Sequence, residues 1–220
     1  MATKRSYDDG CATAHALDLV GERWALLVVR ELLFGPKRFT DLRTGLPGAS
    51  PNVLSQRLRE LEESGVLRRR KLAPPSSARV YELTEWGREL EPVVMALGRW
   101  GARSPALPRK VSTSVDSMMC AVKTLYDPAR ATGFAADLGL SLDDDRFHLR
   151  FANGLMIRRG EPERPDAVVA TTPGTLDQLL WSGRALSDAE AAGEATVTGD
   201  RDRVERFLTM FPMPEPALHP

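Results

Sequence analysis

Three side chains that can read the edges of bases recur at helical spacing in the segment SPNVLSQRLRELEESG, which begins at Ser50. At about 100° per residue, Asn52, Gln56 and Arg59 fall on one stripe of a helix, and Ser55 lies at its edge. Asn and Gln can hold adenine through two hydrogen bonds, and Arg can hold guanine in the same way. This chemistry needs a helix that presents the three side chains together in the major groove of duplex DNA.

Basic residues suited to phosphate contacts surround this segment, above all in VLRRRKLAPPSSARVYELT directly after it. Arg57 falls near the opposite, leucine-bearing stripe, so we assign it a structural role rather than base reading. The residues that we expect to contact DNA are Lys37, Arg38, Thr40, Ser50, Asn52, Ser55, Gln56, Arg59, Arg68, Arg69, Arg70, Lys71 and Arg79.

The charge distribution supports a polyanionic partner for the first half of the chain only. The 220 residues carry 30 basic and 30 acidic side chains, but residues 1–112 hold 19 Lys and Arg against 13 Asp and Glu. Residues 113–220 hold the remaining 11 basic and 17 acidic side chains. A basic half suits a nucleic acid, and an acidic half does not.

The elements that must position these residues are also indicated by the sequence. Residues 14–20 predict a short helix that turns at Gly21. Trp24, Leu27, Val28 and Leu32 then predict one face of a second helix, which the sequence Phe34-Gly35-Pro36 ends.

Further along, residues 40–43 predict a short third helix, and Ser50 and Pro51 open the helix that carries the base-reading stripe. Two β-prone runs around residues 73–78 predict a hairpin with a long tip. A single helix is expected after Thr84, with its apolar face formed by Trp86, Leu90, Val93, Val94, Leu97 and Trp100. This order of helices, basic hairpin and final helix is that of a winged helix-turn-helix.

The stretch from Cys11 to Trp100 resembles the HxlR-type regulators, relatives of the MarR type. The motifs that carry the resemblance are the Glu-Arg-Trp start, the Phe-Gly-Pro stop, Pro-Gly-x-Ser before the recognition helix, and Arg-Leu-Arg-Glu-Leu-Glu within it. The resemblance implies a dimeric, DNA-binding transcriptional regulator whose subunits associate through the first and last helices of this domain.

Cys11 lies just before the first predicted helix, where some members of that family carry a cysteine that senses oxidants or electrophiles. A thiolate near a helix N-terminus can have a lowered pKa, although the neighbouring Asp8 and Asp9 oppose this shift. Cys120 and the Cys11 of a second subunit are the available disulfide partners. Redox sensing and an inert, packed thiol are both open interpretations.

The second half changes to a period of two and predicts an α+β domain with an antiparallel sheet. Alternating apolar residues from Phe134 to Leu142 and from Phe147 to Phe151 predict two strands, and Asn153-Gly154 predicts the hairpin turn to a third. Residues 166–171 and 195–198 predict two more strands. Helices are expected over residues 115–126, from Thr172, over 185–192, and around Phe207.

Residues 131–211 resemble the sterol-carrier-protein type of domain. The resemblance rests on RPDAVV from Arg164, TPGTL from Thr172, Gly183, and AAGEATVTGD ending at Asp200. It implies a tunnel for an apolar ligand, but the same side chains could equally fill an ordinary core. The candidate lining residues are Phe134, Leu138, Leu140, Phe147, Leu149, Phe151, Leu155, Ile157, Leu180, Trp181, Phe207 and Phe211.

Enzymatic and metal sites are not indicated. The sequence has no Gly-rich phosphate loop and no GxSxG, and its two cysteines and three histidines show no metal-ligand spacing. The three aspartates from Asp143 predict a turn. No apolar run approaches the roughly 18 residues of a membrane span, and the N-terminus lacks the apolar region of a signal peptide. We therefore expect a cytoplasmic protein without a cofactor.

The sequence thus predicts a winged helix-turn-helix domain over residues 11–103, a linker over 104–114 and a sterol-carrier-protein-like domain over 115–215. Its expected partners are an operator in double-stranded DNA, a second copy of itself and an apolar small-molecule effector. One alternative is a redox-sensing regulator with a purely structural C-terminal domain. Another is a lipid-carrier or protein-interaction protein that uses the winged helix for dimerisation.

Overall fold

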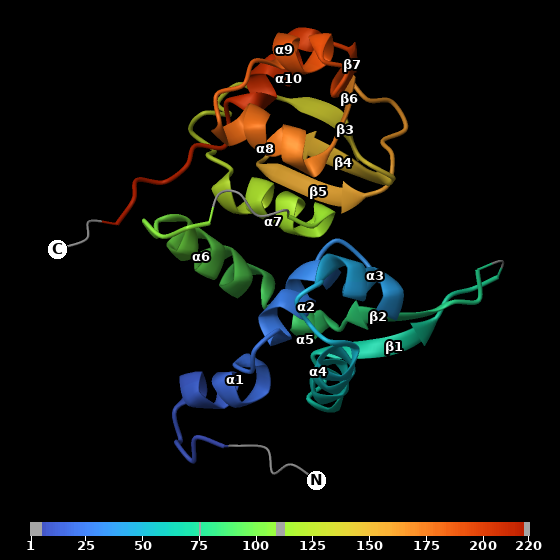
Figure 1. Cartoon of the computed structure of the whole chain (residues 1–220), viewed down its shortest axis with the longest axis vertical. Helices are drawn as coiled ribbons and strands as arrows, with labels where there is room; N and C mark the ends of the chain where they lie inside the picture. Colours follow the sequence, from blue (N-terminus) through green and yellow to red (C-terminus); the bar gives the residue numbers. More distant parts are fainter. Residues whose placement is uncertain (1–5, 75, 109–112, 218–220) are drawn as a thin grey trace. The chain divides into compact units, whose positions relative to one another are not determined.

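The computed structural model describes residues 6–74, 76–108 and 113–217 (Figure 1). Contacts divide the chain into two compact units, Met1–Val94 and Met95–Pro220. The last helix of the predicted winged domain therefore spans the division, whereas the sequence places the boundary at residue 103. Residues 109–112 of the predicted linker lie outside the described residues. No described helix has the length and apolar character needed to cross a bilayer.

The first unit is a helical domain with a two-stranded hairpin (Figure 1). Its elements are α1 (Ala12–Val20), α2 (Ala25–Leu32), α3 (Phe39–Gly45), α4 (Pro51–Glu63), β1 (Leu67–Lys71), β2 (Arg79–Leu83), α5 (Glu85–Arg88) and the start of α6 (Glu91–Ala102). The core is formed mainly by leucines and valines of α2, α4 and the hairpin. This order confirms the predicted winged helix-turn-helix.

The buried face of α2 agrees only in part with the predicted one. Trp24 precedes the helix in a left-handed conformation with φ of 77°, and Leu27 is 38% exposed. Val28 and Leu32 are buried as predicted, and Val29 is buried beside them. The run ALLVV offers two overlapping apolar stripes, so periodicity alone could not select the one that meets the core.

The single helix predicted after Thr84 is two helices, α5 and α6. Pro92 has no amide hydrogen and its ring would clash with the carbonyl of Arg88, so one continuous helix cannot run through this point. A new helix starts at Glu91, with Pro92 in its first turn. The apolar residues of α6 are not buried in the described chain.

Within its described residues, the second unit contains a five-stranded sheet and four helices besides the end of α6. Its elements are α7 (Val115–Leu125), β3 (Ala136–Leu142), β4 (Asp145–Phe151), β5 (Leu155–Arg159), β6 (Ala167–Thr171), α8 (Pro173–Trp181), α9 (Leu186–Ala191), β7 (Ala195–Gly199) and α10 (Arg201–Leu208). The strand order is β5-β4-β3-β6-β7. Helix α7 packs against β5, and α10 packs against β6 and β7.

The α+β class is confirmed, but the sheet is not wholly antiparallel. Strands β3, β4 and β5 form a meander, and β6 pairs with β7 in antiparallel fashion. Strand β6 instead lies parallel to β3, with Leu140 opposite Val169. The alternation of apolar residues sets which face of a strand is buried and leaves the choice of neighbouring strand open.

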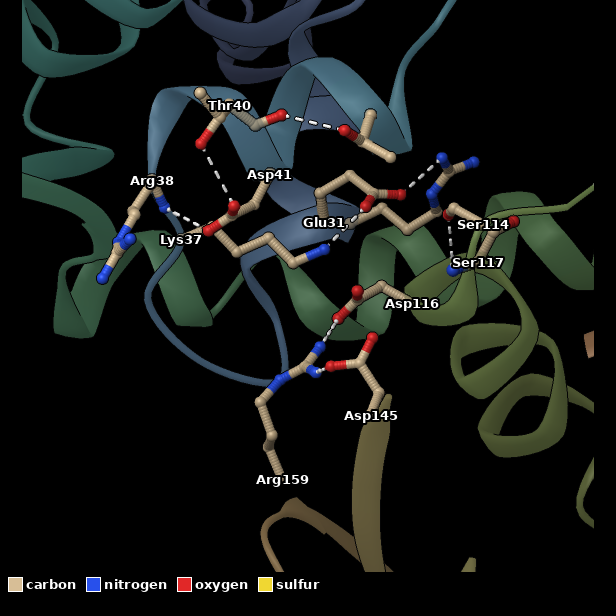
Figure 2. Close-up of polar contacts among 12 residues, drawn as sticks. Glu31, Lys37, Arg38, Thr40, Asp41, Ser114, Asp116, Ser117, Asp145 and Arg159 are labelled. Atoms are coloured by element: carbon tan, nitrogen blue, oxygen red, sulfur yellow. Dashed lines mark hydrogen bonds and ion pairs between the residues drawn. The ribbon is translucent and has the colours of Figure 1, made fainter. Parts of the chain in front are cut away.

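An ion-pair cluster links α7 to the end of the sheet. The side chain of Asp116 is buried, and its Oδ1 atom accepts a hydrogen bond from Nη2 of Arg159 at 2.6 Å. Figure 2 shows the same guanidinium contacting Asp145. Arg159 also lies over the ring of Phe147. One half-buried guanidinium thus bridges two carboxylates at the end of β5.

Candidate nucleic-acid interface

Helix α4 has one buried, mainly apolar face and one exposed polar face. The amide of Val53 donates to Oγ of Ser50 at 3.3 Å, so Ser50 caps the helix as the sequence indicates. Leu54, Leu58 and Leu61 are fully buried. On the other side the structure places Asn52, Gln56 and Arg59 together in solvent, with Ser55 half-buried at the edge. The predicted stripe is therefore exposed to solvent, and base reading by it stays a prediction.

A polar chain that the sequence did not indicate holds part of this stripe. Nε2 of Gln56 donates to Oε1 of Glu60 at 3.0 Å. The other oxygen of Glu60 accepts a hydrogen bond from Arg57, which also lies 3.5 Å from a carboxylate oxygen of Glu22. The side chain of Arg57 is only 10% exposed, in agreement with its predicted structural role. The i, i+4 spacing could have revealed Glu60, but Glu22 is reached only through the tertiary fold.

Strands β1 and β2 form the predicted wing, and three of its five basic residues have acidic partners. Nε of Arg68 and Nε of Arg70 each donate to one oxygen of Glu82, at 2.8 and 2.9 Å. Burial raises the pKa of Glu82, but hydrogen bonds and charges from Arg70 and Arg68 outweigh it, so the pKa lies below its usual value. Arg69 pairs with Glu62 at 2.8 Å.

The remaining two basic wing residues are Lys71 and Arg79. They stand opposite each other in the register of the hairpin, and both are exposed. In the described part of the chain neither has an ion-pair or hydrogen-bond partner on its side chain. They are thus the wing cations whose charge is not already offset by a carboxylate.

The residues predicted ahead of α4 are mostly engaged in holding the fold. Figure 2 shows the contact between Lys37 and the fully buried Glu31. Nζ of Lys37 lies 2.9 Å from Oε2 of Glu31, and the Lys37 side chain is 13% exposed. The Lys37 backbone pairs with Tyr81 of the wing. A phosphate contact by Lys37 would therefore compete with a buried carboxylate.

Arg38 and Thr40 lie at the start of α3. The backbone amide of Arg38 donates to Asp41 at 2.9 Å, and its guanidinium donates to Oγ of Ser76 near the tip of the wing at 3.2 Å. The hydroxyl of Thr40 donates to Asp41 (Figure 2). Arg38 thus connects the turn before α3 with the wing.

Cys11 occupies the N-cap position of α1 and is exposed. The backbone amides of Ala14 and Thr13 in the first turn of the helix lower the pKa of its thiol. Its own amide donates to Asp9 at 2.9 Å. Cys120 is buried on α7. The position of Cys11 is therefore compatible with a reactive thiolate.

The twelve residues proposed to line a ligand tunnel surround the core of the second unit. All are buried except Leu155, Leu180 and Trp181, which are half-buried. Ring centroids of Phe134 and Phe151 lie 5.1 Å apart, as do those of Phe207 and Phe211. These edge-to-face contacts are typical of a packed aromatic core. Ligand binding by these residues stays a prediction.

Metal chemistry finds no support in the described ranges, where no group of three or more His, Cys, Asp or Glu side chains could hold an ion. Asp143 lies in the predicted turn, with a positive φ of 51°. Recognition of DNA by α4 and the wing stays a prediction.

The fold and this site define a winged helix-turn-helix protein. Residues 19–106 match the family described as HxlR-like helix-turn-helix. The regulator YdeP of Bacillus subtilis is 38% identical over 97 residues, which cover 43% of this chain and 74% of that protein. The regulator sll1512 of Synechocystis is 41% identical over 93 residues, covering 42% of this chain and 68% of that protein. Both are described as uncharacterized HTH-type transcriptional regulators.

Among solved structures, the redox regulator HypR in its oxidized form is similar, with 34% identity and a TM-score of 0.39 over 41% of this chain and 94% of that chain. Residues 110–218 match the family described as alkyl sulfatase C-terminal. The chain belongs to the HxlR-like helix-turn-helix family, and its class is that of the HTH-type transcriptional regulators.

Proposed function

We propose that this protein regulates transcription by binding an operator in double-stranded DNA as a homodimer. The observation that carries the proposal is the exposed stripe of Asn52, Gln56 and Arg59 on α4, which lies opposite three fully buried leucines. A helix fixed in this way can enter the major groove without losing its packing. A regulator accounts for this stripe, whereas a lipid carrier or a dimerisation module would not require it.

Phosphate contacts supply the sequence-independent part of the proposed affinity. Lys71 and Arg79 on the wing carry charges without carboxylate partners in the described chain, and Arg59 on α4 is likewise unpaired there. Each phosphate that a cation neutralises releases counterions from the DNA. We therefore assign the strongest salt dependence of phosphate binding to Lys71 and Arg79 and a smaller share to the paired arginines of β1, and we keep base reading as the role of Arg59.

Exposed apolar surface supports the homodimer. On α6, Val93, Leu97 and Trp100 share one stripe, and Trp100 is 77% exposed. Separately, α1 and α5 of the first unit border a cavity of about 230 Å³, beside which Trp86 is half-exposed. Large apolar side chains grouped on one face mark an interaction surface. The resemblance to HxlR-type regulators implies association through the first and last helices of the domain, which are α1 and α6.

Binding-site selection from randomised duplexes tests the proposal. The full chain is expected to enrich a pseudo-palindromic sequence whose half-sites lie about 34 Å apart, one turn of DNA. A variant with Asn52, Gln56 and Arg59 all replaced by Ala is expected to retain the fold and lose the enrichment. Absence of any enriched sequence for the wild type at low salt would disprove sequence-specific binding.

Redox control through Cys11 is a second candidate function. It is favoured by the exposed thiol at the N-cap of α1 and by the amides that lower the pKa of that thiol. If α1 belongs to the dimer interface, oxidation of Cys11 would alter the spacing of the two α4 helices. In this second candidate function, oxidation of the Cys11 thiol would change the affinity for DNA.

An apolar effector in the second unit is the remaining part of the prediction. A ligand that binds only the folded chain at a hundredfold excess over Kd would stabilise it by about 2.7 kcal/mol. A thermal-shift screen of fatty acids, acyl thioesters, sterols and aromatic metabolites on the full chain tests for binding. DNA titration with each hit then tests for regulation. A ligand that binds the DNA-binding and the non-binding arrangement of the chain with equal affinity would leave the DNA affinity unchanged.

A further inference from the structure

The amide of Gln56 on the exposed face of α4 is held in one orientation. We propose that Glu60 is a positioning residue that fixes this amide for recognition of adenine. The inference rests on the proposed function, because it names the base that the Gln56 position reads. In this proposal Glu60 contacts no base and contributes to sequence specificity only through Gln56.

The orientation follows from the chemistry of the carboxylate. An ionised Glu side chain only accepts hydrogen bonds, so the group of Gln56 that faces Oε1 of Glu60 at 3.0 Å must be the NH₂ group. The usual ambiguity between the oxygen and nitrogen of a side-chain amide is thereby removed. Gln56 keeps one carbonyl acceptor and one N–H donor for another partner.

Glu60 is itself held by a buried cation. Its second oxygen accepts a hydrogen bond from Arg57, whose side chain is 90% buried and also lies 3.5 Å from Glu22. Arg57 offsets the negative charge that Glu60 would otherwise bring toward the phosphates. The order in the chain of contacts is therefore a buried Arg57, a half-buried Glu60 and an exposed Gln56.

The remaining groups of Gln56 match adenine and oppose guanine. In the major groove adenine presents the N6 amino donor and the N7 acceptor, which suit one carbonyl oxygen and one N–H. Guanine presents two acceptors, O6 and N7, so the carbonyl of Gln56 would meet another acceptor. Without Glu60 the amide can rotate and donate both hydrogens to guanine. Glu60 therefore strengthens discrimination of adenine over guanine at one position of each half-site.

The test is binding-site selection from randomised duplexes with the full chain, comparing the wild type with Gln56→Ala, Glu60→Gln and Glu63→Gln. Glu63→Gln is the matched control, because Glu63 is an exposed acid on α4 with no polar partner among the described residues. Gln56→Ala is expected to abolish the adenine preference at one half-site position.

At that same position Glu60→Gln is expected to lower the preference for adenine over guanine by about 2- to 12-fold, the range for fixing one mobile side chain. The control is expected to keep the wild-type preference. Circular dichroism checks the fold of each variant, and Glu60→Ala is measured beside Glu60→Gln because it removes every acceptor at this position.

Two outcomes overturn the inference while leaving the proposed function standing. In the first, Gln56→Ala removes a base preference but Glu60→Gln and Glu60→Ala leave that preference at its wild-type value. In the second, Gln56→Ala changes no position of the selected sequence. If the wild type enriches no sequence at all, the proposed function itself fails, and this result is distinguishable from the other two.

Discussion

Glu82 on β2 stands directly opposite Arg68 on β1, and its carboxylate accepts a hydrogen bond from Nε of Arg68 at 2.8 Å. Its other oxygen accepts from Arg70, two residues along the same strand. Residues i and i+2 of a strand share one face, so Glu82 holds two guanidinium groups in a row beside each other. The cluster carries one net positive charge rather than two.

This ion-pair cluster predicts a pH-dependent stability. The pKa of Glu82 is lowered in the folded chain, so its contribution is complete above the usual Glu pKa and is lost as pH falls through the lowered value. Glu82→Gln is expected to reduce the free energy of unfolding at pH 7 by about 1 kcal/mol, a modest value because both arginines are exposed. Urea denaturation followed by tryptophan fluorescence measures it. If the difference in free energy of unfolding between the wild type and Glu82→Gln stays the same well below that pKa, the stabilisation does not come from the ionised Glu82.

Removing a side chain from the exposed stripe on α4 is expected to reduce both the affinity for DNA and the sequence preference. Arg59→Ala is expected to weaken operator binding by about 1–3 kcal/mol and to relax the preference at one base position. The measurement is a fluorescence-anisotropy titration with the selected operator and with single-base variants of it. Arg158→Ala, an exposed arginine on β5, serves as the control. Equal weakening on every sequence would show that Arg59 contacts phosphate rather than a base.

The basic residues of the wing are expected to fall into two classes that differ in their effect on the salt dependence of DNA binding. Lys71→Ala and Arg79→Ala are each expected to weaken binding to all duplexes alike and to reduce the salt slope by about 1. Arg69→Ala is expected to reduce the slope by less, because Glu62 already offsets its charge. Titrations over a series of salt concentrations measure the slopes. Identical slopes for the three variants would mean that DNA displaces Glu62 from Arg69.

The exposed thiol at the start of α1 predicts sensitivity to oxidants. Mild peroxide or a quinone is expected to release DNA from the wild type and not from Cys11→Ser. Cys120→Ala is expected to respond like the wild type, because Cys120 is buried. DNA affinity before and after treatment is the measurement. If Cys11→Ser responds as the wild type does, Cys11 has no sensing role.

The apolar stripe of α6 predicts the oligomeric state. Trp100→Glu is expected to convert the dimer to a monomer in sedimentation velocity, because a charge would replace a large apolar contact at the proposed interface. The fold of the single subunit should be unaffected, because Trp100 is 77% exposed in one chain. Arg158→Glu, which introduces a carboxylate at an exposed position on β5, tests whether any such charge has the same effect. A Trp100→Glu dimer of wild-type stability would exclude this stripe from the interface.

Much of the architecture follows from local patterns in the sequence. Leu54, Leu58 and Leu61 at helical spacing required one face of α4 to be buried, which places Asn52 and Gln56 on the opposite face. Alternating apolar residues determined β3 and β4, and Asn153-Gly154 determined the turn before β5. These signals are reliable because each depends only on residues within a few positions of one another.

The tertiary structure decided the features that join distant segments. The parallel pairing of β3 with β6, the exposure of Leu27 and the contact of Arg57 with Glu22 have no local signature. The same is true of the row of Arg68, Glu82 and Arg70, which exists only in the register that the hairpin adopts. A basic residue looks the same in the sequence whether its charge is available or offset. Which of the two applies depends on carboxylates that folding brings within a few ångströms, and this proximity separates Lys71 and Arg79 from the other wing cations.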